Sequence, residues 1–385
     1  MDRGSSAVTP LRVASLFCGI GGLDLGFERE GFEVVWANDL LHSAADAYAK
    51  NFGRPVQRGD LMELPLGLIP EVDVIIGGPP CQSFSLVGRR DPLDPRGSLV
   101  FRFRDIVDSR RPRAFVMENV PGMAASRVGG RRLTDLLLED FDAMGYRVAL
   151  LQLLATDYLV PQRRRRIFLV GSFDRAIGPP DAGTFALRIL GRRPTAEDVS
   201  ARAAIGDLGE CGQRGARVAY ADDPQSAFAR LMRPKGTDDV TLHECPRMSI
   251  RDREFVRHIP PGGNYRDIPD RVATPRIMKF KETGGRTTTY GRLHPDQPAY
   301  TINTYFRRPN VGCHFHYERD RLITAREAMR FQALPDAFEV HASRQDERNA
   351  LIGNAVPSLL AQAVAWSLDL ALRGGSQASV EPVAA

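Results

Sequence analysis

Strand-like and helix-like segments alternate along residues 12–172, and this alternation limits the chain to few folds. The strand-like segments are short and rich in β-branched residues, which is typical of strands buried on both faces of a parallel sheet. Helix-like segments between them favour a doubly wound α/β sheet. The expected strands are 12–17, 33–37, 72–76, 114–117 and 167–170, and the expected helices are 23–30, 43–51, 99–107 and 133–144.

The amino-acid composition of the sequence changes at about Pro179. From there to Arg319 it is rich in Gly, Pro, Arg and Thr, with short β-like pieces, which indicates a smaller, loop-rich, partly β second domain. Helical signals return at Thr324, which forms a predicted capping box with Glu327, and again at residues 355–372. We place the first domain at 11–175, completed by a C-terminal helix at 353–373, the second at 176–320, a return segment at 321–352 and a flexible tail at 374–385.

Composition and charge narrow the class of protein. The chain has 385 residues, of which 43% are hydrophobic and 26% charged, as in an ordinary globular protein. The N-terminus lacks an apolar signal region, and the longest apolar tract is interrupted by Gln362 and Asp369, so we expect a cytoplasmic protein that contacts no membrane. All but four of the 52 basic residues are arginine, whose planar fork suits phosphates and guanine edges, so a nucleic-acid partner is favoured.

The cysteines give no metal or disulfide signature. The five cysteines form no C-x-x-C pair, so neither a disulfide framework nor a structural zinc site is indicated, and no metal is expected. His243 with Cys245, and Cys313 with His314 and His316, lack the second pair that a zinc site needs.

One cysteine stands apart because of its neighbours. Cys81 follows the expected strand 72–76 in the sequence Gly-Gly-Pro-Pro-Cys-Gln-Ser-Phe-Ser. Ligands of open α/β sheets bind at the carboxyl ends of the strands, where this thiol would lie. An isolated cysteine is usually a buried apolar residue, but Pro79 and Pro80 fix two backbone angles that a core cysteine does not need.

A glycine-rich turn after the first expected strand indicates a nucleotide-type cofactor. Gly19, Gly21 and Gly22 allow the backbone to approach a ligand closely. Asp39 follows twenty residues after Gly19, where an acid accepts hydrogen bonds from ribose hydroxyls, and Asp60 ends the next strand, within reach of an adenine amino group. A dehydrogenase uses the same geometry and remains an alternative, although the turn departs from G-x-G-x-x-G and Cys81 suits group transfer better.

Six ordered motifs together resemble the bacterial DNA (cytosine-5)-methyltransferases. The resemblance covers about residues 11–175 and 320–372, and the stretch from Pro179 to about Arg292 falls where this family carries its variable target-recognition region. It implies a Rossmann-like, S-adenosylmethionine-dependent methyltransferase sheet with a target-recognition domain. The motifs are Phe17-x-Gly19-x-Gly21-Gly22, Gly78-Pro79-Pro80-Cys81-Gln82-Ser83-Phe84-Ser85, Glu118-Asn119-Val120, Gln162-x-Arg164-x-Arg166, Arg326-Glu327 with Gln332 and Pro335-Asp336, and Gly353-Asn354-Ala355-Val356-Pro357.

The resemblance implies four catalytic residues. The Cys81 thiolate adds to C6 of cytosine, because C5 is otherwise a poor nucleophile toward the methyl group of S-adenosylmethionine. Glu118 polarises N3 of the base, which requires a protonated or proton-sharing carboxyl group. Arg166 contacts the flipped base and Arg164 serves phosphate contact or loop positioning, while Arg163 and Arg165 face solvent.

The same resemblance implies the cofactor site. Phe17 packs against adenine, unless it is only a core residue, and Asn354 opens the last helix as an N-cap while also touching the cofactor. Leu40 stands where some relatives have an aromatic residue, which removes an expected stacking contact. The implied cofactor residues are Phe17, Gly19, Gly21, Gly22, Asp39, Asp60, Leu61, Pro80, Asn354 and Ala355.

Access to C5 requires that the base leave the duplex. We expect residues 83–98, which include Arg89 and Arg90, to form a mobile loop that closes over the DNA. Contact with phosphates alone is an equally good interpretation of the arginines in the second domain. The candidate DNA-binding residues are Ser85, Arg96, Arg286, Arg292, Arg307 and Arg308.

Three functions remain in view. The leading one is a sequence-specific DNA cytosine-5 methyltransferase, either the modification enzyme of a restriction–modification system or a solitary relative. We expect it to act as a monomer on double-stranded DNA, with any restriction endonuclease acting separately, and to associate with the bacterial nucleoid. A tRNA cytosine-5 methyltransferase is the second function, but its Cys-Phe-Thr signature is missing, and a silent DNA-binding module is the third.

Overall fold

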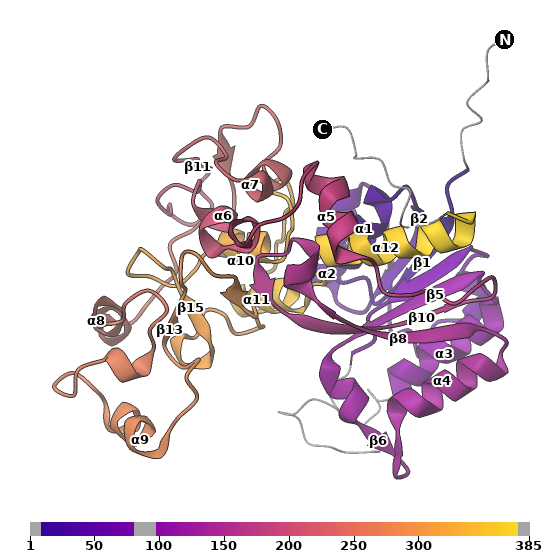
Figure 1. The fold of residues 1–385 in the computed structure, drawn as a ribbon, viewed down its shortest axis with the longest axis horizontal. Coiled ribbons are helices and arrows are strands. Elements are labelled where there is room, and N and C mark those ends of the chain that lie inside the picture. Colours follow the sequence, from indigo (N-terminus) through magenta and orange to yellow (C-terminus); the bar gives the residue numbers. More distant parts are fainter. Residues whose placement is uncertain (1–8, 81–97, 376–385) are drawn as a thin grey trace.

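The computed structural model describes residues 9–80 and 98–375. Figure 1 shows a layered domain around a central sheet and, beside it, a second part made of loops and short helices. The positions of Cys81, Ser85 and Arg96, the predicted loop 83–98 except its last residue, and the predicted tail beyond residue 375 lie outside the described residues.

A seven-stranded mixed sheet forms the centre of the first domain, in the order β3-β2-β1-β4-β5-β10-β8. Five strands are parallel, β10 runs antiparallel to β5, and β8 runs antiparallel to β10. The predicted α/β class is confirmed. The strands are β1 (Arg12–Leu16), β2 (Glu33–Asp39), β3 (Gln57–Arg58), β4 (Val74–Gly77), β5 (Ala114–Asn119), β8 (Arg147–Leu154) and β10 (Arg165–Ser172).

Helices cover both faces of this sheet (Figure 1). Successive residues of β1 pack into opposite layers, since Val13 joins the cluster around α1 and α12 while Ala14 joins the one around α3 and α4. This explains why the parallel strands are continuously apolar. The helices are α1 (Gly22–Arg29), α2 (His42–Phe52), α3 (Ser98–Arg110), α4 (Leu133–Ala143) and α12 (Ser358–Arg373).

The last helix, α12, packs against the first, α1. A Cβ atom on Gly26 would lie 2.5 Å from both the Cβ of Ala361 and the backbone nitrogen of Gln362, so the glycine sets how closely the helices approach. The stretch Gln345–Arg373 is long and apolar enough to cross a membrane by length and composition, but 83% of its most apolar window is buried inside the fold. It is therefore a core element, and the predicted return of the last helix to the first domain is found.

The second part contains more helix than the sequence indicates. Its helices are only five to nine residues long and most begin at a side-chain cap, as at Ser226, Ser249 and Thr274. The elements are α5 (Ala182–Leu190), α6 (Ala201–Ile205), β11 (Val218–Ala219), α7 (Ala227–Met232), β12 (Asp239–Val240), α8 (Ile250–His258), α9 (Pro275–Thr283), β13 (Gly291–Arg292), β14 (Ala299–Tyr300) and β15 (Cys313–Phe315).

Helix α5 lies on the first domain, although the sequence places it in the second. The ring of Phe185 contacts those of Tyr158 and Trp366, at centroid distances of 6.1 and 6.0 Å. The apolar face of α5 thus extends the first core beyond residue 175. The remaining elements are β6 (Arg127–Val128), β7 (Arg131–Arg132), β9 (Gln162–Arg163), α10 (Ala325–Phe331) and α11 (Gln345–Asn354).

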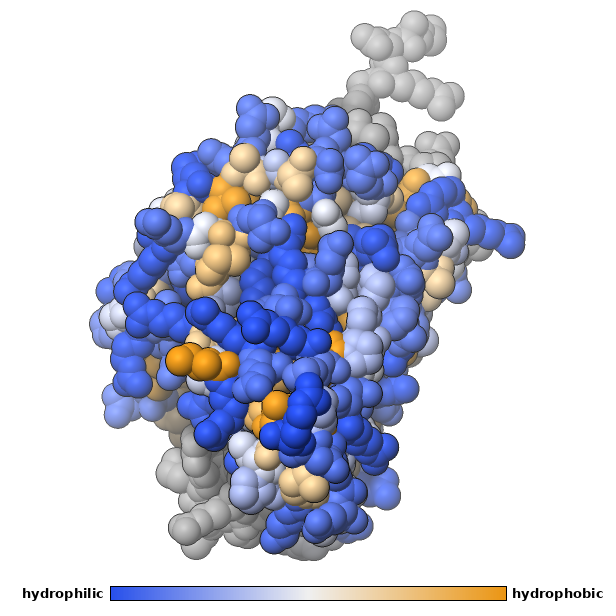
Figure 2. Space-filling view, turned by 90° about the vertical axis from the view of Figure 1, so that its left-hand side faces the viewer, coloured by the Kyte–Doolittle hydropathy of each residue, from blue (hydrophilic) through white to orange (hydrophobic). Residues whose placement is uncertain are grey.

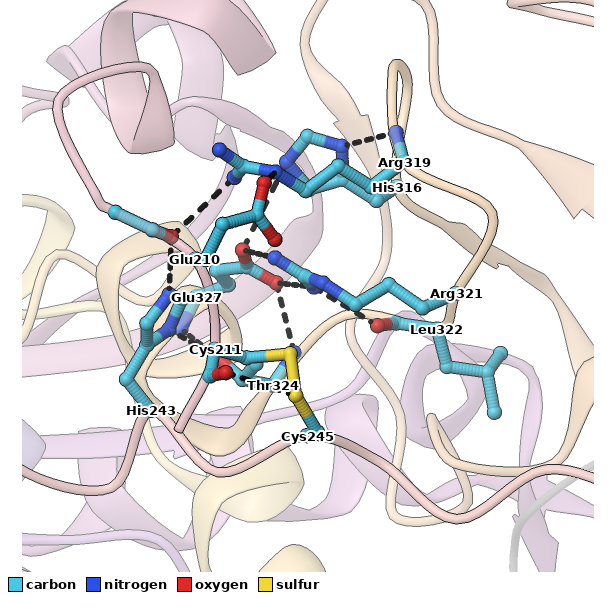
Figure 3. Close-up of a disulfide and its surroundings, with 11 residues drawn as sticks. Glu210, Cys211, His243, Cys245, His316, Arg319, Arg321, Leu322, Thr324 and Glu327 are labelled. Atoms are coloured by element: carbon cyan, nitrogen blue, oxygen red, sulfur yellow. Dashed lines mark hydrogen bonds and ion pairs between the residues drawn. A yellow bond between two sulfur atoms is a disulfide. The ribbon is translucent and has the colours of Figure 1, made fainter. Parts of the chain in front are cut away.

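A buried polar cluster joins α10 to the second part (Figure 3). The predicted capping box is confirmed: the Thr324 hydroxyl accepts from the Glu327 N–H at 3.1 Å, and the Glu327 carboxylate accepts from the Thr324 N–H at 2.7 Å. Arg321 donates to both oxygens of Glu327, which holds the pKa of that carboxyl well below its ordinary value despite burial. His243 bonds to the Thr324 hydroxyl at 2.9 Å.

A disulfide joins Cys211 and Cys245 next to this cluster, so the expectation of no disulfide was wrong. The two cysteines are 34 positions apart, and the lack of a C-x-x-C pair carries no information about a link of that length. Within residues 9–80 and 98–375, no three His, Cys, Asp or Glu side chains are grouped to hold a metal ion.

Candidate active site

Glu118 and Arg166 form an ion pair at the edge of the sheet where the parallel strands end. Glu118 lies near the end of β5, Arg166 near the start of the neighbouring antiparallel β10, and Arg166 Nε is 2.7 Å from Glu118 Oε1. Both side chains are 11% exposed. The alternation of β10 thus brings the predicted base-contacting arginine to the predicted acid.

Burial governs the protonation of Glu118. Removal from water raises the pKa of its carboxyl group, and this effect outweighs the lowering by Arg166 and Arg164. A raised pKa brings protonation closer to neutral pH, as a carboxyl group that donates a hydrogen bond requires.

The segment that leads to Cys81 lies directly against Glu118. A Cβ atom on Gly78 would be 3.3 Å from Glu118 Oε2, and the Asn119 side-chain amide donates to the Pro79 carbonyl at 3.1 Å. The ends of β4 and β5 therefore bring the start of the segment that leads to Cys81 next to Glu118. The Asn119 contact was not predicted, although Asn119 belongs to a recognised motif.

Arg164 is a structural residue. It is 2% exposed, and its guanidinium donates at 2.8 Å to the carbonyls of Ile302 and Gly353. Phosphate contact, one of the two predicted roles, is wrong because the guanidinium is enclosed among backbone carbonyls. Its role is positioning, as it joins β10 to the end of α11 and to the segment after β14.

The turn after β1 leaves open space for a ligand. Gly19 has a φ of +56°, and nothing lies within 4 Å of the position that its Cβ would occupy. Phe17 also has a positive φ, 54°, which is uncommon for a bulky residue and is found where a functional site requires it. Its half-buried ring packs on the α3–α4 layer, so the predicted core contact exists.

Asp39 fixes this turn. Its carboxylate accepts from the N–H groups of Gly19 and Leu41, both at 2.8 Å, and burial raises its pKa. Beside it, Leu40 is 60% exposed and presents an apolar surface. An acid, an open glycine turn and an exposed apolar side chain fit a purine nucleoside group.

Asn38 was missed by sequence reasoning. Its amide donates to the carbonyls of Gln57 at 2.8 Å and Gly59 at 3.1 Å, which holds the end of β3 beside β2. Asp60 follows, with its carboxylate accepting from the Met62 N–H at 2.9 Å, and Leu61 is buried. The feature of the sequence that could have pointed to Asn38 is an asparagine next to an acidic residue at the end of a strand.

Asn354 does not open the last helix. It is the exposed final residue of α11, whereas α12 begins at Ser358 after Pro357, since proline fits the start of a helix and not its interior. Ala355 follows and is buried. The proposed N-cap is therefore wrong, and the proposed cofactor contact of Asn354 remains a prediction.

The DNA-binding candidates divide into buried and exposed residues. Arg292 is 8% exposed and donates to the carbonyls of Val256, Ile259 and His316, so it cannot reach a base edge as predicted. Arg307 is half-buried and donates to Gln345. Arg286 and Arg308 are exposed, on a second part whose surface is mainly hydrophilic in the face shown in Figure 2.

The sheet order and the open glycine turn held by the half-buried Asp39 are those of an α/β protein that binds a nucleotide-type cofactor. The model of the C-5 cytosine-specific DNA methylases matches residues 11–369, and the chain belongs to this family. It is therefore a DNA cytosine-5 methyltransferase that acts on DNA, with S-adenosylmethionine as the methyl donor.

Individual relatives span nearly the whole chain. The type II methyltransferase M.AgeI of Thalassovita gelatinovora is 31% identical, over 94% of this chain and 100% of the relative. M.NgoFVII of Neisseria gonorrhoeae is 33% identical, over 90% of this chain and 83% of the relative. Among solved structures, the S. pombe Dnmt2 methyltransferase has the same fold, with a TM-score of 0.60 and 14% identity, over 94% of this chain and 99% of that one.

Proposed function

We propose that this enzyme is the sequence-specific modification methyltransferase of a type II restriction–modification system, and that Cys81, Glu118 and Arg166 perform its chemistry. The observation that carries the assignment of residues is the buried Glu118–Arg166 pair against the segment that leads to Cys81. The type II names of its relatives support the biological role.

The Cys81 thiolate adds to C6 of the extruded cytosine and leaves the electron pair on C5. Protonated Glu118 donates to N3 and stabilises the negative charge that this addition places on the ring. Arg166 holds the Glu118 carboxyl group in place and contacts the base. Transfer of the methyl group to C5 would leave the cofactor as its neutral thioether. Loss of the C5 proton to solvent then restores the double bond and expels the thiolate.

S-adenosylmethionine supplies an electrophilic methyl group at this site. Asp39 would accept from the ribose hydroxyls, Asp60 would contact the adenine amino group, and the glycine turn would let the backbone approach the nucleoside closely. The full set of proposed cofactor residues is Phe17, Gly19, Gly21, Gly22, Asp39, Asp60, Leu61, Pro80, Asn354 and Ala355.

Sequence reading belongs to the second part. Exposed Arg286 and Arg308 are the remaining base-contact candidates among the described residues; the guanidinium of Arg308 lies 4.7 Å from the ring centre of Tyr305. Arg307, Ser85 and Arg96 keep the proposed role of DNA contact. The enzyme works as a monomer in the bacterial cytoplasm, at the nucleoid, and its cognate endonuclease acts separately.

The test is base-resolution sequencing of 5-methylcytosine in DNA from a methylation-free bacterial host that expresses this chain. We expect modification of one short motif by the wild type and by Cys313→Ala, and none by Cys81→Ala. Modification by Cys81→Ala would overturn the covalent mechanism. Unmodified DNA from cells that contain folded protein able to bind S-adenosylmethionine would overturn the proposed function and make RNA the substrate to test.

A further inference from the structure

A cleft of about 590 Å³ opens beside the Glu118–Arg166 pair. One wall comes from the first domain, with Thr156, Arg163, Arg165 and Arg166, and the other from the segment around β14, with Pro298 and Thr301. The cleft thus lies at the junction between the first domain and the second part, next to the proposed catalytic acid.

Two of the three arginines on its wall carry uncompensated charge. Arg166 is already bonded to the Glu118 carboxyl group. Arg163 donates to the neutral amide oxygen of Gln297 at 2.9 Å, and no carboxylate among the described residues pairs with it. Arg165 is exposed, and its guanidinium has neither an ion pair nor a hydrogen bond within residues 9–80 and 98–375.

The backbone that carries these arginines is fixed. β9 pairs with β14, with Arg163 opposite Tyr300, and the Thr301 hydroxyl donates to the Arg163 carbonyl at 2.6 Å. Arg163 ends β9 and Arg165 begins β10, and both side chains line the cleft. The two arginines therefore present two cations to the cleft, whereas Arg164 between them is buried.

We propose that Arg163 and Arg165 bind successive backbone phosphates of the DNA strand that carries the target cytosine, and so position the extruded nucleotide at Glu118. This inference rests on the proposed function and deepens it. Two unpaired guanidinium groups match a phosphodiester chain in charge and in hydrogen-bond geometry. Both residues are exposed, as the sequence predicts, and the proposal adds a role in positioning.

The test compares Arg163→Gln, Arg165→Gln and the double variant with Arg175→Gln. Arg175 is an exposed arginine beyond the other end of β10, so it matches the change in charge at a distance. Affinity for a mixed-sequence duplex of about 30 base pairs is measured between about 50 and 200 mM NaCl. A variant that makes fewer phosphate contacts releases fewer counterions when it binds DNA. We therefore expect the slope of log K against log[NaCl] to become shallower by about 0.9 for each single variant and about 1.8 for the double.

Activity on unmethylated phage DNA supplies a second readout. We expect each single variant to raise KM for DNA by about tenfold, with kcat within about twofold of the wild type, and thermal midpoints equal to that of Arg175→Gln. A salt slope equal to that of Arg175→Gln would overturn the inference. A shallower slope in a protein that methylates no DNA would support the phosphate contacts and overturn the proposed function.

Discussion

At the residue scale, the site depends on the opposing effects that set the pKa of Glu118 beside a cation. Arg166 favours the ionised carboxylate, whereas burial favours the neutral form and prevails. The pair also leaves the guanidinium of Arg166 with a partner before DNA arrives. A cytosine ring that accepts a hydrogen bond from the carboxyl group would add to the stability of the neutral form of Glu118.

Activity should depend on pH through Glu118. Because the pKa of the carboxyl group is raised, its protonated form persists to a higher pH than in an ordinary glutamate, and kcat should fall as pH rises through that pKa. Glu118→Gln should lower kcat by about 10² to 10⁴ and lose this dependence, since an amide does not titrate. A kcat profile between about pH 5 and 9 checks both, and a variant profile parallel to the wild type would contradict the role of Glu118.

For Arg292 we predict a role in stability and none in the choice of the methylated motif. Arg292→Ala leaves three carbonyls without their donor, so we expect a loss of at least about 2 kcal/mol in the free energy of unfolding and an unchanged methylated motif. Arg286→Ala, which removes an exposed side chain, should keep stability and weaken DNA binding. Denaturant titration with motif sequencing separates the two; an altered motif for folded Arg292→Ala would contradict the structural role.

The site residues whose positions could be predicted from the sequence belong to short motifs, in which neighbouring residues determine the backbone conformation. Arg166, near the start of β10, lies against Glu118, the acid of a neighbouring motif. The burial of Arg292 and of Arg164 depends instead on carbonyls from distant segments, such as Ile302 and Gly353, and no local pattern encodes those contacts.

At the element scale, the pairing of α1 with α12 depends on small residues. Gly26 faces the backbone of α12, and any side chain there would meet Ala361 and Gln362. Close helix approach of this kind extends the contact area between the two apolar faces. It also leaves the glycine turn of the cofactor site, just before α1, attached to a fixed support.

We expect Gly26→Ala to destabilise the protein by about 1–3 kcal/mol, because the added methyl group forces the two helices apart. Gly67→Ala is the matched control, since nothing lies within 4 Å of its added Cβ and its φ is not positive. Thermal unfolding of both variants checks this. Equal midpoints would contradict the packing role of Gly26.

Elements with several turns or a clear apolar run could be predicted, and the others could not. The alternation of residues 12–172 predicted α1 to α4 and most strands. The antiparallel edge strand β8 was missed because it is rich in leucine and has a single β-branched residue, Val148. Helices of five to nine residues in the second part are too short for a periodic pattern, and their caps resemble loop residues.

At the scale of the whole molecule, covalent closure adds to the polar contacts that fix the second part. The Cys211–Cys245 link closes a loop with α7, β11 and β12 inside it. Partners of the buried Arg330 lie before and after this loop in the sequence, since Arg330 bonds to Asp207 and Asp336. The link constrains the unfolded chain as well as the folded one.

Reduction of this disulfide should lower the free energy of unfolding by up to about 3 to 4 kcal/mol, the entropy of a loop of this length. We expect dithiothreitol to lower the thermal midpoint of the oxidised wild type to that of Cys245→Ser and to leave the variant unchanged. An equal response of both proteins to the reductant would show that the link contributes nothing to stability.

The α1–α12 pairing has a consequence for how the protein is made. The Arg29 guanidinium donates to the Ser358 hydroxyl at 3.2 Å, across 329 positions of sequence. At translation rates of about 5–20 residues per second, α1 leaves the ribosome on the order of tens of seconds before α12 exists. Throughout that interval the nascent chain carries an uncovered apolar helix face, and the glycine turn before α1 gains its supporting helix only after α12 has been synthesised.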